Sequence, residues 1–310
     1  MSRRYLQLDV FADRPGAGNP LAVVLDAGAC PELGRPSLDD AQMQAIARWT
    51  RLPETTFVFA PTQPGASYRI RIFSPRREVP FAGHPSVGTA HVVLDAGLAT
   101  ARDGRLLQEG IAGLLPLSVE GDGAARTIAV RTPRARAVEI ATNRDDPRLA
   151  PAIAGLAMGA LPPALMDGGR RWWLAELADE ATVRATSPDW AAIAQLADST
   201  GTMGLCVFAR SDAGRDYDLV VRAFVGAPAQ FEDAASGAAN ATLAAWLRHN
   251  DALPGRDDRL TGSRRYTVSQ GREVGFDARL QLRVDGDGEV WSGGQVCNVV
   301  RGTIDWPGIG

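Results

Sequence analysis

The chain has 310 residues, of which 45% are hydrophobic and 22% charged, and its formal net charge is −3. This length and apolar content suffice for two domains with buried cores, whereas a negative charge is untypical of a nucleic-acid-binding surface. All 33 basic residues are arginine. Without lysine, the chain cannot form a lysine Schiff base, an internal pyridoxal phosphate aldimine or a Walker-type phosphate loop.

The first half is predicted to begin with a β-hairpin and a helix. Alternating apolar and polar residues indicate a strand over 5–11, and a Gly/Pro turn leads to a second strand over 21–25. Ser37 is the expected N-cap of a helix with Leu38, Ile46 and Trp49 as its apolar positions. This helix should stop just before Glu54, which places that carboxylate at a corner between a helix and the next strand.

The most informative stretch follows two further strands, predicted over 54–59 and 68–73. A small-residue turn over 80–85 contains Gly83, His84 and Pro85, and an apolar helix is expected from Ser86 onward.

The second half repeats this plan at an offset of about 150 residues, which indicates an internal duplication. A strand over 217–224 leads through the turn 231–240 into a helix over 241–247. Phe73 and Phe224 end the corresponding strands. The remaining predicted strands cover 265–269, 278–284, 289–292 and 295–300.

Both turns lead into a helix N-terminus, where backbone N–H groups and the helix dipole favour a negative charge. Two such ends would suit the carboxylate of a small-molecule substrate. Glu54 is the candidate base, although a solvated corner carboxylate is the simpler interpretation. His84 lies at the mouth of the first helix, where packing does not call for a histidine, so a functional role is favoured there.

Other polar residues have structural interpretations. Glu232 and Asp233 precede the second helix and could simply cap it. His91 and His249 lie on helices and are expected to be structural. The histidines lack metal-ligand spacing, so no metal site is expected.

The three cysteines, Cys30, Cys206 and Cys297, form no close pair, and no disulfide framework is expected. The N-terminus is too polar for a signal peptide, and no apolar run approaches the ~20 residues of a membrane span. We therefore expect a cytoplasmic protein that binds neither nucleic acid nor membrane.

Four segments occur in a characteristic order. They are Gly18-Asn19-Pro20-Leu21, Glu54-Thr55-Thr56-Phe57, Phe81-Ala82-Gly83-His84-Pro85 and Glu232-Asp233-Ala234-Ala235-Ser236-Gly237. Together with Gly293-Gly294 near the C-terminus, this order resembles the PhzF-like family of phenazine biosynthesis isomerases over nearly the whole chain.

The resemblance implies an α+β fold of the diaminopimelate epimerase type, with two pseudo-symmetric domains and the active site between them. Each domain is a β-barrel-like sheet wrapped around a central helix. We expect the first domain over 1–125 with the C-terminal strand 298–310, and the second over 126–297. The resemblance also implies a homodimer and no cofactor.

The resemblance further assigns roles within the site. Glu54 corresponds to the residue that moves a proton between substrate carbons, and His84 and Asp233 to residues that assist it or position the substrate. The expected substrate-binding residues are Gly83, Pro85 and Ser86 in the first turn and Ser236, Gly237 and Ala238 in the second.

Related epimerases carry a cysteine in each turn. Here the corresponding positions are expected at Ala82 and Ala234, which disfavours a racemase with two catalytic thiols.

Two departures from the family pattern bear on the substrate. Ala238 stands where the family has a functional serine, and Ala234 and Ser236 replace its proline and threonine. Residues 276–278 replace the Arg-Pro-Ser that often follows the family's Gln-Gly segment, here Gln270-Gly271. Both departures point away from the phenazine precursor more than from the fold.

We therefore expect a cofactor-independent isomerase of secondary metabolism that shifts a proton within a small carboxylate-bearing metabolite. An amino-acid epimerase with Glu54 and His84 as opposed acid and base is an alternative. A catalytically silent ligand-binding homologue is another.

Overall fold

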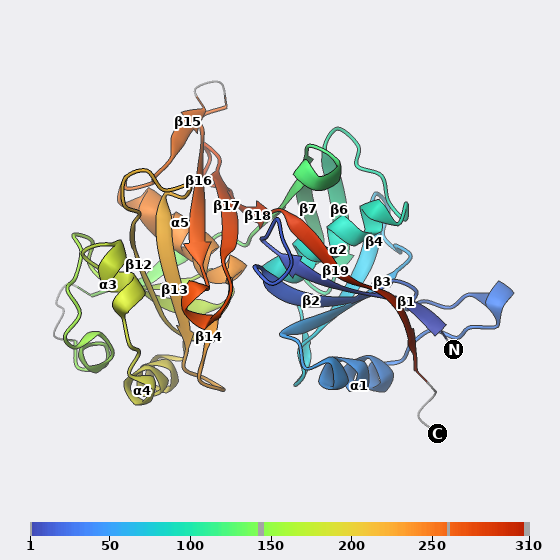
Figure 1. Cartoon of the computed structure of the whole chain (residues 1–310), viewed down its shortest axis with the longest axis horizontal. Helices are drawn as coiled ribbons and strands as arrows, with labels where there is room; N and C mark the ends of the chain where they lie inside the picture. Colours follow the sequence, from blue (N-terminus) through green and yellow to red (C-terminus); the bar gives the residue numbers. More distant parts are fainter. Residues whose placement is uncertain (1, 142–145, 259–260, 307–310) are drawn as a thin grey trace. The chain divides into compact units, whose positions relative to one another are not determined.

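The computed structural model describes residues 2–141, 146–258 and 261–306. The chain divides into two compact units (Figure 1): unit 1 is Met1–Arg131 with Gly293–Gly310, and unit 2 is Thr132–Ser292. The divisions thus fall after residues 131 and 292, whereas the sequence analysis placed them after 125 and 297.

Unit 1 is a curved sheet with two α-helices. Its strands are β1 (Ser2–Val10), β2 (Asn19–Val24), β3 (Glu54–Phe59), β4 (Tyr68–Phe73), β5 (Glu78–Val79), β6 (Arg105–Gly110), β7 (Gly113–Glu120), β8 (Thr127–Arg131) and β19 (Val296–Asp305). Its helices are α1 (Asp40–Thr50) and α2 (Gly83–Asp95), with 3-10 turns at Pro31–Leu33 and Gly123–Ala125. The strands pair in the order β19-β1-β2-β3-β4-β6-β7-β8, with β5 on β4. The strand β18 (Val290–Gly294) pairs with β8 where the chain returns to unit 1.

Unit 2 has the same plan. Its strands are β9 (Arg136–Ile140), β10 (Ala164–Asp167), β11 (Arg171–Glu176), β12 (Gly204–Arg210), β13 (Leu219–Val225), β14 (Phe231–Asp233), β15 (Arg256–Asp258), β16 (Ser263–Gln270) and β17 (Ala278–Val284). Its helices are α3 (Glu180–Ala185), α4 (Trp190–Thr200) and α5 (Gly237–His249), with 3-10 turns at Ala150–Ile153 and Arg272–Val274. The order β9-β10-β11-β12-β13-β16-β17, with β14 on β13, repeats the order found in unit 1.

The repeat extends to strand direction and to the central helix. In each unit one parallel pair is bridged by the central helix: α2 connects β4 to β6, and α5 connects β13 to β16. All residues of α2 from Gly83 to Val93 are buried, since the helix packs against β1, β2, β3, β8 and β19. At Gly88 an added Cβ would lie 2.5 Å from Cδ2 of Leu21, so any larger residue would displace side chains of the sheet. The internal duplication predicted from the sequence is confirmed.

An arginine–glutamate pair is duplicated at the same place in both units. Arg71 on β4 donates to both carboxylate oxygens of Glu78 on β5 at 2.6 Å, and Arg222 on β13 does the same to Glu232 on β14 at 2.9 and 2.7 Å. Each guanidinium also lies over the phenylalanine two residues on, Phe73 or Phe224. Two-pronged contacts of this kind fix the short strand that leads into each central helix.

The expected helix starts were wrong at three places. The first helix is capped by Asp39, not Ser37, because Asp39 and Gln42 form a reciprocal capping box. The helix α2 begins at Gly83, three residues before Ser86, since proline is well tolerated in a first turn whose N–H groups have no partner within the helix. The helix α5 likewise begins at Gly237, before the expected Ala241.

One expected core position is also wrong. Trp49 is 63% exposed and packs edge-on against Trp306 at a ring distance of 6.1 Å. By contrast Leu38 and Ile46 belong to the core of unit 1. No helix in the described part of the chain is both long and apolar enough to cross a membrane.

Candidate functional site

Glu54 and His84 lie together in unit 1. The Oε2 atom of Glu54 is 3.4 Å from Nε2 of His84, and the two side chains are 12% and 8% exposed. Glu54 is the first residue of β3, and His84 is in the first turn of α2. The fold therefore brings a nearly buried carboxylate and an imidazole into contact from positions thirty residues apart in sequence.

Two hydroxyl pairs hold the start of β3, where Glu54 lies. Thr55 contacts Thr50 at the end of α1 at 2.9 Å, and Thr56 contacts Thr89 on α2 at 2.8 Å. Thr55 and Thr56 are fully buried. Because these contacts tie β3 to both helices of unit 1, the carboxylate of Glu54 is held beside the first turn of α2.

The first turn of α2 lacks a side-chain cap. Its N-cap is Ala82, which has no polar side-chain atom, and Pro85 contributes no N–H group. The N-terminal turn of a helix carries a partial positive charge. This end of α2 is therefore electrostatically suited to an anionic group, with Gly83 as a main-chain donor.

Ser86, an expected substrate-binding residue, makes hydrogen bonds within unit 1. Its hydroxyl donates to the carbonyl of Ala82 at 3.0 Å and accepts from Nε2 of Gln108 at 3.1 Å. Its backbone N–H also goes to Ala82. A hydroxyl has only one proton, so in this arrangement Ser86 shapes the turn and has no donor left for a ligand.

The second turn lies in unit 2 and carries Asp233 at the end of β14. One carboxylate oxygen of Asp233 accepts from the N–H of Ala235 at 3.2 Å, which closes a short turn. Glu232 does not cap α5, because its carboxylate is taken up by Arg222 and is only 4% exposed. Capping by this acidic pair, the simpler interpretation of the sequence, is therefore wrong.

Ser236 is the N-cap of α5 and accepts from the N–H of Ala239. Since Ala82 and Ser236 are the N-caps of the two 13-residue central helices, Ser236 corresponds to Ala82. The sequence analysis matched Ala234 to Ala82, two residues too early. Neither N-cap is a cysteine, so the argument against a pair of thiols in the turns is unaffected.

Gly237 and Ala238 are the first two residues of α5, so Ala238 corresponds to His84 of α2. Ala238 is half-buried and has no polar side-chain atom. The two turns are therefore chemically unequal, with an imidazole in one and a methyl group in the other.

The cysteines and the other histidines are not residues of these two turns. Cys206 is buried on β12, and burial raises the pKa of its thiol to about 12. His91 is buried beside Asp95, with 3.3 Å between Nε2 and Oδ2, and burial lowers its pKa. His249 stacks on Trp246. Over the described ranges, no cluster of three or more His, Cys, Asp or Glu side chains could hold a metal ion.

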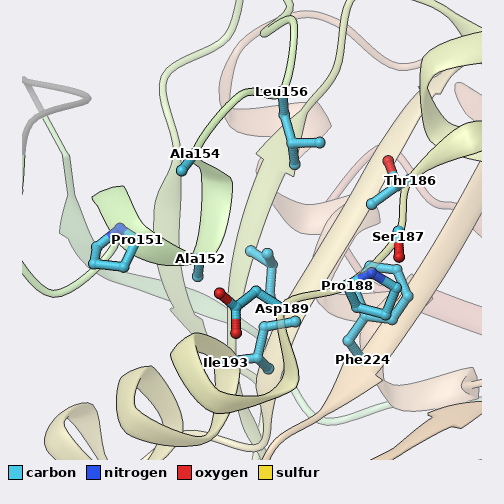
Figure 2. Close-up of a pocket in the computed structure, with 11 residues that line it drawn as sticks. Pro151, Ala152, Ala154, Leu156, Thr186, Ser187, Pro188, Asp189, Ile193 and Phe224 are labelled. Carbon is cyan, nitrogen blue, oxygen red and sulfur yellow. The ribbon is translucent and has the colours of Figure 1, made fainter.

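A small pocket of about 90 Å³ lies elsewhere in unit 2 (Figure 2). Its walls come from the 3-10 turn at Ala150–Ile153, the segment before α4, and β13, with Ala152, Asp189 and Phe224 among them. The carboxylate of Asp189 already caps α4 by accepting from Ala192. None of the expected site residues lines this pocket, so it is separate from both turns.

Three residues that contact the turns escaped the sequence analysis as site candidates: Gln108, Asn240 and Gln270. Gln108 bonds to Ser86, and Gln270 bonds to Asn240 and to the turn at Asp233. The two glutamines share no simple sequence spacing. Gln108 lies two residues before the end of β6, which directly follows α2, whereas Gln270 ends β16, which the short strand β15 separates from α5.

Two repeats of one strand order, each around a buried helix that begins at a small-residue turn, define the diaminopimelate epimerase-like class of α+β proteins. The family model described as phenazine biosynthesis-like protein, PhzC-PhzF, matches residues 8–300. The chain therefore belongs to the PhzC-PhzF family.

Individual relatives agree with this assignment. The trans-2,3-dihydro-3-hydroxyanthranilate isomerase of Pseudomonas aeruginosa is 34% identical over 92% of this chain and 92% of that enzyme. The Schizosaccharomyces pombe protein named antisense-enhancing sequence 1 is 30% identical over 96% of this chain and 97% of its own length. The solved PhzF family structure from Bacillus anthracis superposes with a TM-score of 0.79 at 19% identity, covering 98% of this chain and 99% of that one.

Proposed function

We propose that this chain is an isomerase that moves a proton, and with it a double bond, within a small carboxylate-bearing metabolite. The observation that carries the proposal is the contact between the nearly buried Glu54 and His84 beside the uncapped end of α2. Membership in a family that includes relatives named isomerases supports the reaction class.

The proposed chemistry uses one carboxylate twice. The C–H bond of the substrate breaks, the Glu54 carboxylate takes the proton, and the released electron pair shifts the double bond. Protonated Glu54 then returns a proton to a different carbon, so that atoms and charge balance without an oxidant or reductant. His84 is proposed to orient Glu54 and the substrate.

The remaining roles are assigned to residues of the two turns that precede α2 and α5. The substrate carboxylate is proposed to bind at the first turn of α2, through the N–H of Gly83 and the helix dipole. Asp233 is proposed to position the substrate, as its place in the family motif implies. This scheme needs no cofactor. Secondary metabolism and a homodimer remain parts of the proposal.

The test is proton exchange with solvent. The protein is incubated in D₂O with trans-2,3-dihydro-3-hydroxyanthranilate, the compound in the names of the relatives, which serves as a probe and should react slowly because Ala238 lacks a hydroxyl. Mass spectrometry and NMR of the product should show deuterium on one carbon, and Glu54→Gln should abolish it. The matched control is Glu120→Gln, the same change at an exposed position of unit 1. Full exchange in Glu54→Gln would contradict the assignment.

One observation favours a second candidate, a ligand-binding homologue without turnover: Ala238 supplies no hydroxyl where the family has serine. Binding of the same compound by wild type, with no deuterium incorporation at any enzyme concentration, would favour this candidate. An amino-acid epimerase with Glu54 and His84 as opposed acid and base gains no support from their contact, since 3.4 Å between Oε2 and Nε2 leaves no room for a substrate carbon between them. Chiral analysis of the product distinguishes it from an isomerase.

A further inference from the structure

We propose that Gln108 and Gln270 are positioning residues, which lock the first turns of the two central helices in the shape that the reaction requires. The catalytic importance of these turns rests on the proposed function. The locks themselves are visible in each unit separately.

In unit 1 the lock joins β6 to α2. Gln108 is 1% exposed, donates from Nε2 to the hydroxyl of Ser86, and accepts at Oε1 from the hydroxyl of Tyr68 at 3.1 Å. Ser86 in turn donates to the carbonyl of the N-cap, Ala82. The strand after the helix thus holds the helix start through one serine.

In unit 2 the lock joins β16 to α5. Gln270 is fully buried, and its Oε1 accepts from Nδ2 of Asn240 at 2.8 Å and from the backbone N–H of Ser236 at 3.2 Å. Its Nε2 donates to the carbonyl of Asp233 at 2.8 Å. Asn240 also donates to the carbonyl of the N-cap, Ser236. A single amide therefore bonds to the main chain on both sides of the Asp233–Ser236 turn.

The two locks use equivalent positions on the helices, but their glutamines differ by two residues in strand register. Ser86 and Asn240 are each four residues after the N-cap of their helix, and each donates to the carbonyl of that N-cap. Gln108 lies opposite Tyr68 of β4 and Gln270 opposite Val221 of β13, whereas Tyr68 corresponds to Leu219 because Phe73 corresponds to Phe224. The glutamines are therefore two residues apart in register, on the same face of their strands. What the two units share is a buried glutamine amide that bonds to the helix residue four positions after the N-cap.

Close packing at the next residue reinforces the second lock. Gly271 has φ +94, and a Cβ there would lie 2.4 Å from the carbonyl oxygen of Ala234. The backbone after Gln270 therefore presses directly on the turn between Asp233 and Ser236. Gln270 must supply a donor and an acceptor at once, which a neutral amide does and neither leucine nor a carboxylate can.

The decisive measurement is residue-resolved amide hydrogen exchange by NMR. In Gln270→Leu, the N–H of Ser236 loses its acceptor and should exchange at least tenfold faster, while amides of the 81–91 segment keep their wild-type rates. Gln108→Leu is the matched control in the other repeat, and it should leave the N–H of Ser236 unchanged. Unchanged exchange at Ser236 in Gln270→Leu, or equal acceleration of both turns, would overturn the proposal.

A second variant guards against failure to fold. Gln270→Glu keeps the oxygen that accepts from Ser236 and loses the donor to Asp233, so Ser236 should stay protected while the N–H of Ala235 exchanges faster. If the N–H of Ser236 lost its protection equally in Gln270→Glu and Gln270→Leu, that result would contradict the assigned geometry.

Measurement of kcat distinguishes a positioning role of Gln270 from a purely stabilising role. With trans-2,3-dihydro-3-hydroxyanthranilate as substrate, kcat of folded Gln270→Leu should fall at least tenfold, with partial recovery in Gln270→Glu. A loosened turn with unchanged kcat would refute a positioning role. If wild type does not turn this compound over, the proposed function fails for that substrate, whereas the exchange rates still decide whether the lock exists.

Discussion

At the scale of single residues, Ala238 stands where the resemblance to the family implies a serine. A serine hydroxyl there would add one donor at the second residue of α5. One hydrogen bond to a charged group contributes about 1.5–3 kcal/mol, which corresponds to roughly 10- to 100-fold in binding or rate.

We therefore expect Ala238→Ser to raise kcat/KM for trans-2,3-dihydro-3-hydroxyanthranilate by about 10- to 100-fold. The steady-state assay should include Ala245→Ser, the same change at a half-buried position two turns further along α5. Equal effects of the two substitutions, or none from the first, would remove Ala238 from the list of substrate-contacting positions.

The thiols provide a second prediction at this scale. The pKa of Cys206 is raised to about 12 by burial, so almost none of it is thiolate at pH 8. Cys30 and Cys297 are only partly buried. Iodoacetamide should therefore label Cys30 and Cys297 before Cys206, and labelling should leave deuterium incorporation intact. Peptide mass spectrometry measures the first result, and activity lost in step with alkylation would instead indicate a catalytic thiol.

At the scale of elements, the duplicated arginine–glutamate pairs differ in burial. The side chain of Arg222 is 6% exposed and that of Arg71 is 26% exposed. Arg222 also donates to the carbonyls of Val183 and Thr186, which ties β13 to the C-terminal end of α3. Removing one partner of a buried pair costs about 3–5 kcal/mol, because the other charge is left without compensation.

Arg222→Met should therefore lower the free energy of unfolding by about 3–5 kcal/mol, and Arg71→Met by clearly less, because water reaches that pair. Urea unfolding followed by circular dichroism measures both. The double variant Arg222→Met with Glu232→Leu should be more stable than Arg222→Met alone, since it removes the uncompensated carboxylate. Equal losses in the two single variants would contradict this account.

Elements with a regular pattern were predictable from the sequence, and those with mixed signals were not. The strands Glu54–Phe59, Tyr68–Phe73 and Ala278–Val284 have the predicted bounds. The starts of α2 and α5 were missed because Gly, Pro and Ser are typical of turns as well as of first helical turns. The local sequence alone does not separate these two uses.

Contacts between elements that are far apart in the chain could not be predicted from the sequence. Glu54 was a candidate and so was His84, but their contact depends on how β3 lies against α2. The pairing of Glu232 with Arg222 depends on the antiparallel register of β13 and β14, and this register cannot be inferred from the sequence. For the same reason Ser236, and not Ala234, could be matched to Ala82 only once both helix starts were known.

At the scale of the whole molecule, each unit has its own hydrophobic core, one that includes Ile46 and Phe57 and another that includes Trp173 and Phe224. Stability against acid should follow from titrating groups in both units. Burial lowers the pKa of His91, an effect that Arg126 and Arg301 reinforce and Asp95 opposes. Hydrogen bonds from Arg4 and Arg279 lower the pKa values of Asp26 in unit 1 and Asp216 in unit 2.

His91, Asp26 and Asp216 all change stability in the same direction, so that stability falls as the pH falls. Below about pH 6.5 the unfolded chain protonates His91 while the folded chain resists, so stability falls as the pH drops towards the lowered pKa. Below about pH 4 the unfolded carboxyls bind protons that folded Asp26 and Asp216 do not, and stability falls again. Asp9 acts in the opposite direction, because burial raises its pKa.

We therefore expect the melting temperature to decline in two stages, first between about pH 7 and 5 and then below about pH 4. Differential scanning calorimetry from pH 8 to 3 measures this profile. In His91→Gln the first stage should disappear and the second remain, whereas Asp26→Asn should reduce only the second. Because His91 lies on the central helix of unit 1 and Asp26 follows β2, the two variants assign each stage to a place in the fold. A first stage of equal size in His91→Gln would show that another group controls it.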